Sequence, residues 1–242
     1  MAFHISLTDN RSDIVREYAE GIRLSGPYEV GLKSFVTYNT VPNISPENRN
    51  NRFQMINEKT REGCVVDIPT GVYELDDLFQ LIREDPGVKA AEPRMRLELN
   101  KNTLRTVLYT EEWTIDFPPG NKGSTVGTVF GFSPGTYPPK IAHSSNMLVD
   151  IFSINAIKIK CNLVSGNYDN LKHNDNTLYK FPLNSEIGEK IIERPNTLSY
   201  YMVNTDTIYT LVVRIVDQDD KSVDFRGERI NITLEFRPVA QR

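Results

Sequence analysis

The end of the chain carries a strict alternation of apolar and polar residues, which limits the fold more than any other feature of the sequence. Over residues 230–237, every second position is apolar and the positions between are polar. Successive side chains of a β-strand point to opposite faces, so this pattern predicts a strand with one buried and one wet face. A similar alternation covers residues 211–215, before an acidic turn at 217–220. Together the two segments predict a half-buried β-hairpin that closes an all-β fold.

Short segments rich in β-branched and aromatic residues recur along the chain and predict further strands. They lie at residues 30–38, 64–68, 95–99, 106–109, 113–117, 157–163, 177–183, 190–193 and 198–203. Short strands at this spacing favour a sandwich or a barrel, and the jelly roll is one standard form. We therefore predict an all-β fold, a jelly-roll β-sandwich with one short amphipathic helix. It is either one elaborated jelly roll or two small sandwiches.

The predicted helix interrupts the β pattern. Its apolar residues, at the i, i+3, i+4 and i+7 positions that place them on one helix face, are Leu75, Leu78, Phe79 and Ile82. The run Asp85-Pro86-Gly87 is expected to stop it. We expect this helix to cover the open end of a sheet rather than to bind a ligand.

At 242 residues the chain can bury a core, and β-sandwiches of this length are often single domains. We predict one jelly-roll domain over residues 1–242, with Pro138-Pro139 as the point where it could divide. The segment 30–38 is broken at Val41-Pro42-Asn43, and the asparagine-rich residues 45–52 that follow predict a surface loop.

Charge and composition exclude several classes of protein. The chain has 28 Lys and Arg against 32 Asp and Glu, and the two signs are interspersed, so we expect no direct binding of nucleic acid. No apolar run approaches the roughly 18 residues of a spanning helix, and the N-terminus lacks a secretory signal pattern. Two cysteines do not make a disulfide framework, so we expect Cys64 and Cys161 to be buried free thiols in a reducing compartment.

Motifs that carry chemistry are missing from the sequence. His4, His143 and His173 do not have the spacing of zinc ligands. The glycine-containing residues 120–125 lack the spacing of a phosphate-binding loop, and no nucleophile elbow occurs. The acidic turn 217–220 lacks the distal glutamate of an EF-hand and predicts a solvated hairpin tip. We therefore expect no catalytic, cofactor-binding or metal-ligating residues, no cofactor and no enzymatic activity.

A set of segments, taken in order, resembles one family of viral proteins. The segments are 28–32 (Tyr-Glu-Val-Gly-Leu), 35–44, 68–75 (Ile-Pro-Thr-Gly-Val-Tyr-Glu-Leu), 129–132 (Val-Phe-Gly-Phe), 159–163, 214–219 and 225–228 with the closing strand. The chain resembles the penton (minor capsid) proteins of Polinton/Maverick elements and adintovirus-like viruses, in the PRD1–adenovirus capsid lineage. This resemblance implies a structural jelly-roll subunit that forms homopentamers at icosahedral vertices and contacts the major capsid protein. It also implies a place in the virion, after assembly in the host cytoplasm or nucleus.

A pentamer is a ring in which one patch of each subunit meets a different patch of its neighbour. Tyrosine is enriched at such contacts, and four tyrosines in or beside predicted loops are candidate interface residues. They are Tyr137, Tyr168, Tyr200 and Tyr201. The alternative for each is an ordinary residue of a sandwich edge. The alternative for the whole chain is a β-sandwich binding module that recognises a glycan or a cell-surface partner. A cupin-like enzyme would need a histidine-rich metal set, which this chain lacks.

Overall fold

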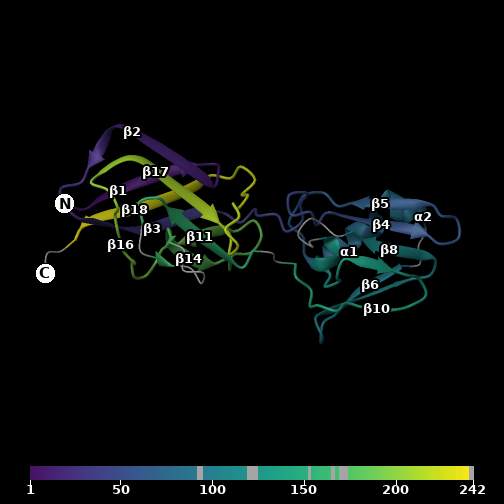
Figure 1. Cartoon of the computed structure of the whole chain (residues 1–242). Coiled ribbons are helices and arrows are strands. Elements are labelled where there is room, and N and C mark those ends of the chain that lie inside the picture. The colour runs from purple at the N-terminus through teal and green to yellow at the C-terminus, as the bar shows by residue number, and fades with distance from the viewer. Residues whose placement is uncertain (92–94, 119–124, 152–153, 165–166, 169–173, 240–242) are drawn as a thin grey trace. The chain divides into compact units, whose positions relative to one another are not determined.

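The structure, a computed structural model, describes residues 1–91, 95–118, 125–151, 154–164, 167–168 and 174–239. It divides the chain into two compact units (Figure 1): unit 1 is Met1–Val41 with Ile154–Arg242, and unit 2 is Pro42–Ser153. Each unit has its own cluster of buried hydrophobic side chains. The division therefore falls where the chain leaves and re-enters unit 1, not at Pro138-Pro139, which forms a turn between two strands inside unit 2.

Unit 1 consists of antiparallel strands in two main sheets. Its long strands are β1 (Phe3–Asp9), β2 (Asp13–Arg23), β3 (Tyr28–Tyr38), β11 (Ala156–Cys161), β14 (Thr177–Pro182), β15 (Lys190–Glu193), β17 (Thr207–Val216) and β18 (Ile230–Pro238). Three shorter strands are described as well: β12 (Asn167–Tyr168), β13 (Asn174–Asp175) and β16 (Tyr201–Met202). One sheet has the order β1-β18-β3-β15, with β16 also on β3, and the other has the order β14-β11-β17-β2.

This strand order is that of a jelly roll. Counted in chain order among the described long strands, the first sheet holds the first, eighth, third and sixth, and the second holds the fifth, fourth, seventh and second. Each sheet thus interleaves early and late parts of the chain, as the two Greek keys of a jelly roll do. The predicted all-β jelly-roll class is confirmed for unit 1, and unit 2 is inserted between its third and fourth long strands.

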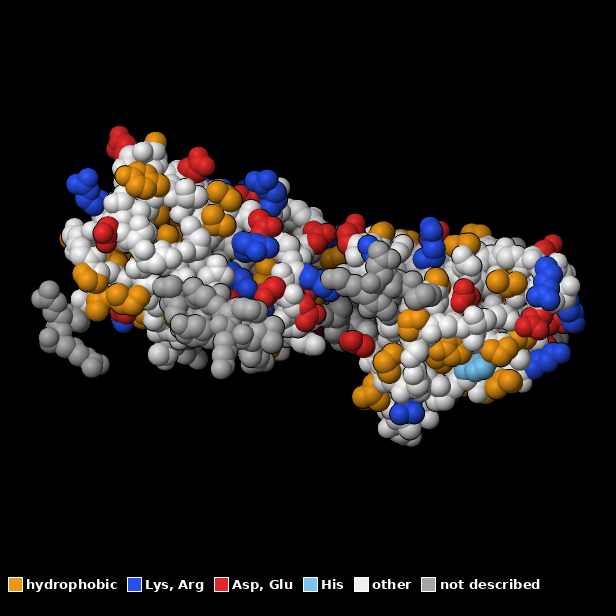
Figure 2. Space-filling view, viewed as in Figure 1, with side chains coloured by type: hydrophobic (Ala, Val, Ile, Leu, Met, Phe, Trp, Pro, Cys, Tyr) orange, Lys and Arg blue, Asp and Glu red, His pale blue; other side chains and the backbone are white. Residues whose placement is uncertain are grey.

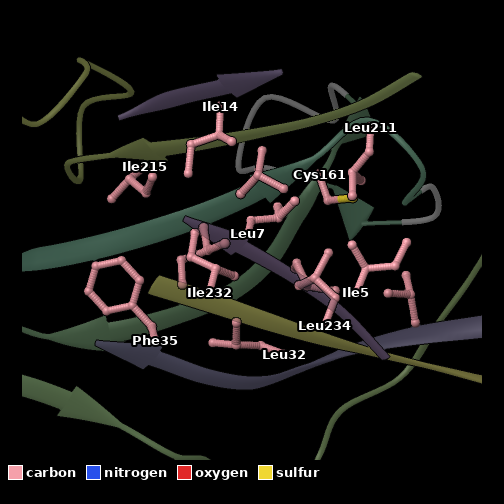
Figure 3. Close-up of a cluster of buried hydrophobic side chains, with 14 of the residues drawn as sticks. Ile5, Leu7, Ile14, Leu32, Phe35, Cys161, Leu211, Ile215, Ile232 and Leu234 are labelled. Atoms are coloured by element: carbon pink, nitrogen blue, oxygen red, sulfur yellow. The ribbon is translucent and has the colours of Figure 1, made fainter. Parts of the chain in front are cut away.

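The core of unit 1 lies between the two sheets. Leu7, Leu32 and Ile232 of one sheet and Ile14 and Ile215 of the other point toward one another (Figure 3). All of them are at most 2% exposed. The alternation over residues 230–237 predicted this burial correctly, because the apolar positions of β18 face the second sheet.

The last two long strands do not form the predicted hairpin. β17 pairs with β11 and β2, whereas β18 pairs with β1 and β3, so the two strands belong to different sheets. The connection over residues 217–229 crosses from one sheet to the other. Both strands bury their apolar faces in the same core from opposite sides, and this satisfies the alternation as well as a hairpin would.

Unit 2 mixes short strands and helices around a separate core. Its strands are β4 (Arg52–Asn57), β5 (Gly63–Asp67), β6 (Met95–Asn100), β7 (Arg105–Thr110), β8 (Trp113–Phe117), β9 (Gly135–Tyr137) and β10 (His143–Ser144). They form the sheets β5-β4-β8-β9 and β10-β7-β6. The predicted helix is present as α1 (Leu75–Glu84), and Leu78, Phe79 and Ile82 are buried as expected.

The expectation of a single helix is wrong, because the described part of unit 2 contains two more. α2 (Pro86–Ala91) begins where α1 was expected only to end. Asp85 Oδ1 accepts the backbone N–H groups of Gly87 (2.8 Å) and Val88 (3.1 Å), so Asp85-Pro86 starts a new helix as its cap and first residue. α3 (Val126–Val129) is a single short turn of helix in the apolar segment before Phe132.

The asparagine-rich segment is a loop with exposed residues at 46, 47 and 49, as predicted, but buried polar side chains hold it in place. Asn43, Ser45 and Asn50 are at most 5% exposed. Asn50 accepts the N–H of Ser45 (2.9 Å) and donates to the carbonyl oxygen of Asn43 (2.7 Å). Asn43 in turn binds both backbone groups of Tyr73. These side chains replace the hydrogen bonds that water would otherwise supply, and they fix the chain where it enters unit 2.

Candidate interaction surfaces

Tyr137 is part of the core of unit 2. Its ring centroid lies 5.5 Å from that of Phe117 and 5.0 Å from that of Phe132. Its hydroxyl donates to the carbonyl oxygen of Ser133 (2.8 Å), and burial raises the pKa of the phenol. The side chain is therefore engaged within its own unit on both its apolar and its polar end.

Tyr200 lies against the outer face of the sheet β1-β18-β3-β15, over Gly31 of β3. A Cβ atom on Gly31 would lie 3.2 Å from the Tyr200 ring and 2.9 Å from the carbonyl oxygen of Ser199, so the ring rests directly on the strand. On its other side the guanidinium of Arg237 lies 3.4 Å from the ring centroid, a cation–π contact. The hydroxyl donates to Glu235 (3.0 Å).

Glu235 is the centre of a charged network on this outer face. Besides Tyr200, it contacts His4 Nε2 (2.9 Å) and Lys33 Nζ (3.4 Å). The hydrogen bond from His4, followed by that from Tyr200, holds the pKa of Glu235 below its ordinary value. Nearby, Arg237 pairs with Glu29 (2.5 Å). The network joins β1, β3 and β18 across the sheet.

Tyr201 is in β16, which pairs with β3 at Val30 and Glu29. It is half-buried and packs against the core of unit 1, while its neighbour Met202 is 48% exposed. The side chains of Tyr168 and His173 and most of the glycine-containing residues 120–125 lie outside the described residues. The structure thus brings Tyr200 and Tyr201 together beside one strand, and it places Tyr137 in the other unit.

The two most exposed tyrosines among those whose side chains the structure describes were missed by the sequence reasoning. Tyr209 of β17 is 60% exposed and Tyr38 of β3 is 41% exposed. By simple alternation Tyr209 should share the buried face of Leu211. A break in the pairing register between Ile208 and Thr210 turns it outward instead. A break of this kind depends on the partner strand β2, so the alternation within β17 does not reveal it.

The acidic turn 217–220 binds lysines rather than a metal. Asp220 lies 2.6 Å from Lys158 Nζ and 2.8 Å from Lys160 Nζ. Burial raises the pKa of Asp220, but the hydrogen bonds from Lys158 and Lys160 outweigh burial and leave the pKa below its ordinary value. Asp217 is buried and accepts the N–H groups of Asp219 and Lys221. The turn is therefore fixed to β11. Asp219 and Asp220 are exposed, as predicted, but the turn is not the tip of a hairpin.

Four further features concern possible metal ligands, spanning helices, the distribution of charge and the thiols. Among the described residues, no group of three or more His, Cys, Asp or Glu side chains is placed to hold a metal ion. Nor does any helix in the described ranges have the length and apolar character needed to span a bilayer. Lysines, arginines and acidic residues are interspersed over both units in Figure 2. Both cysteines are free; Cys161 is buried, which raises its pKa to about 11, whereas Cys64 is only half-buried.

This geometry defines a class of protein: a jelly roll with a second unit inserted between two of its strands. No protein-family model and no curated protein matches the chain. Among solved structures, the crystal structure of the selenomethionine-labelled mavirus penton protein matches with a TM-score of 0.52 and 14% sequence identity. The match covers 99% of this chain and 100% of the mavirus chain, so it includes both units. What the two chains share is the fold.

Proposed function

We propose that the chain is a structural protein of a viral capsid, a penton subunit that forms homopentamers at the vertices and contacts the major capsid protein. The observation that carries this proposal is the fold shared with the mavirus penton protein over the whole of both chains. The resemblance of segments 28–32, 68–75 and 214–219 to penton proteins supports it. The proposal places the protein in the virion, after assembly in the host cytoplasm or nucleus, and assigns it no reaction.

Tyr200 and Tyr201 remain candidate interface residues in this proposal. Tyr201 and the exposed Met202 form β16, which pairs only with β3 among the described strands, and Tyr200 directly precedes it. Tyr168 also remains a candidate. Tyr137 is the weakest candidate, because its ring packs against the core of unit 2, whereas the ring of Tyr200 lies on the outer face of its sheet.

Analytical ultracentrifugation and negative-stain microscopy of the purified protein test the proposal directly. We expect rings of about five subunits, either with the protein alone or after addition of the major capsid protein from the same genome. Monomers under both conditions would contradict it. Monomers that bind strongly on a glycan array would favour the binding-module alternative.

The interface candidate has its own test. Met202→Asp places a charge on the exposed edge beside Tyr200 and Tyr201, and should dissociate the rings while the monomer stays folded. Tyr209→Asp changes an exposed residue of the other sheet (60% exposed, against 48% for Met202) and is the control. If the rings persist in the Met202→Asp variant, this edge is not part of the interface, and the capsid assignment is unaffected.

A further inference from the structure

A groove runs between α1 and β6 in unit 2, where Figure 1 shows the two elements side by side. Its volume is about 580 Å³, within the roughly 300–1,000 Å³ typical of ligand-binding clefts. The apolar lining comes from Phe79 of the helix and from Leu97 and Leu99 of the strand. Around it lie charged side chains of both signs, Asp76 and Arg83 from α1 and Glu98 and Lys101 from the strand side.

Among the described strands, β6 has a neighbour on one side only, β7, and its other edge is free. On its β10 side, β7 uses the backbone of alternate residues: the carbonyl oxygens of Thr106 and Thr110 accept the N–H groups of Ser145 and Lys140. Toward β6 it must therefore use Arg105, Val107 and Tyr109, because an antiparallel strand bonds to its two neighbours with alternate residues.

The partners of those β7 residues in β6 are Asn100, Glu98 and Arg96. By the same alternation, the N–H and C=O groups of Met95, Leu97 and Leu99 point away from β7. β6 is the last strand of its sheet among the described strands, so these groups face the free edge. Leu97 and Leu99, which line the groove with their side chains, also present backbone groups there.

One side chain already binds this edge as a strand would. Arg83 of α1 donates from its guanidinium to the carbonyl oxygen of Leu97 (3.1 Å). That bond independently places the Leu97 carbonyl on the groove side of β6. In a paired strand, a backbone N–H would occupy the same position, so a peptide strand could displace the exposed guanidinium and continue along the edge.

We propose that this groove binds an extended peptide segment of another protein, which adds to β6 as a further strand. Backbone hydrogen bonds to Leu97 and Leu99 supply the pairing. Peptide side chains at alternate positions lie on the same face as Leu97 and Leu99 and contact the partly exposed Leu99, since Phe79 and Leu97 are each only 4% exposed. α1 forms the opposite wall, which favours a single strand over the edge of a second folded sheet. This site is separate from the proposed ring contacts at Met202, which are in unit 1, and it does not depend on the capsid assignment.

The probe is a random peptide library displayed on phage and selected against the purified full chain, followed by fluorescence anisotropy with the selected peptides. We expect selected sequences with apolar residues at alternate positions. Gln80→Trp fills the groove from α1 and should weaken their binding at least about tenfold. Asp77→Trp alters an exposed residue of the same helix outside the groove and should leave binding unchanged.

Hydrogen exchange supplies the readout specific to strand addition. Bound peptide should slow exchange at the amides of Leu97 and Leu99, and not at the exposed amides of α1. Three results would overturn the proposal: a library that yields no binder, binders that Gln80→Trp does not affect, or binding without protection of these two amides. Self-association of the chain that Gln80→Trp abolishes would assign the groove to a second copy instead.

Discussion

Gly131, which follows α3, has a left-handed backbone with φ of +80°. A Cβ atom at this position would lie 2.4 Å from the carbonyl oxygen of Met147. The N–H of Met147 also donates to the carbonyl oxygen of Gly131 (2.9 Å), so the two segments are in direct backbone contact. Backbone cannot rotate aside as a side chain can, and any larger residue would force the segments apart.

Gly131→Ala should therefore destabilise unit 2 by about 2–5 kcal/mol, from left-handed strain and the clash together. Gly227 provides a matched control, because it has nearly the same φ, +79°, and nothing within 4 Å of its Cβ position. Gly227→Ala should cost about 1–2 kcal/mol from backbone strain alone. Denaturant unfolding measures both, and equal losses would contradict a role for the Met147 contact.

Glu235 makes the stability of unit 1 depend on pH. Folding lowers its pKa, chiefly through the hydrogen bonds from His4 and Tyr200. The unfolded chain then binds this proton more tightly, so the network stabilises the fold above the ordinary carboxyl pKa of 4.5. The stabilisation is lost as the pH falls through the lower pKa of the folded state.

Glu235→Gln should therefore destabilise unit 1 at neutral pH. The variant should also lose less stability than the wild-type protein below about pH 4.5, because the pKa of Glu235 is lowered by folding. Thermal unfolding as a function of pH measures this change. Glu17→Gln removes an exposed glutamate of β2 and controls for the change in net charge. If the stability of the wild-type protein and of Glu235→Gln falls equally as the pH is lowered, the network does not contribute.

Most side-chain partners at this scale could not be predicted, because they come from distant parts of the chain. The partners of Glu235 are residues 4, 33 and 200, and Asp220 binds residues 158 and 160. Composition shows that a carboxylate is present, but only the jelly-roll strand order brings the cations beside it. For the same reason, the exposure of the candidate interface tyrosines could not be predicted from the sequence.

At the scale of the elements, helix α2 begins at a capping residue, Asp85, that can be recognised in the sequence. Asp85 accepts two backbone N–H groups of the first turn. Asp85→Ala should destabilise unit 2 by about 1 kcal/mol, whereas Asp85→Asn keeps a side-chain oxygen acceptor and should cost only a few tenths. Urea unfolding of the two variants tests this. Equal losses would mean that the charge of Asp85, and not its hydrogen bonds, stabilises the helix.

The positions of many strands were predictable from one apolar face, but strand pairing was not. The predicted strand 190–193 coincides with β15, and the apolar positions of β17 and β18 are buried as expected. β1, β2 and β4 were missed, although Ile5 and Leu7 of β1 and Phe53 and Met55 of β4 alternate with exposed residues. Alternation identifies the buried face of each strand, whereas its neighbours are set by packing across the whole unit.

The molecule as a whole contains two separate hydrophobic cores. Phe35 is fully buried in unit 1, near Phe181 and Phe225. Phe132 is fully buried in unit 2, near Phe117 and Tyr137. Two cores of this kind predict two unfolding transitions rather than one.

Phe35→Ala and Phe132→Ala should each cost about 3–5 kcal/mol, and each should lower a different transition in differential scanning calorimetry. Ile192→Ala, at a 55% exposed site on β15, should change neither transition by more than about 0.5 kcal/mol. A single transition that both phenylalanine variants lower equally would mean that the two units unfold together.

The pairing of β1 with β18 has a consequence for synthesis on the ribosome. Unit 2 is one continuous segment, so it can fold as soon as residues 42–153 have emerged. The jelly roll cannot, because β18 lies between β1 and β3 and is the last of its strands to be made. Until then, β1 and β3 present open strand edges, which invite incorrect pairing with other chains. A newly made chain therefore passes through a state in which unit 2 is folded and unit 1 is not, and the sheet of β1 and β3 is completed only once β18 has been synthesised.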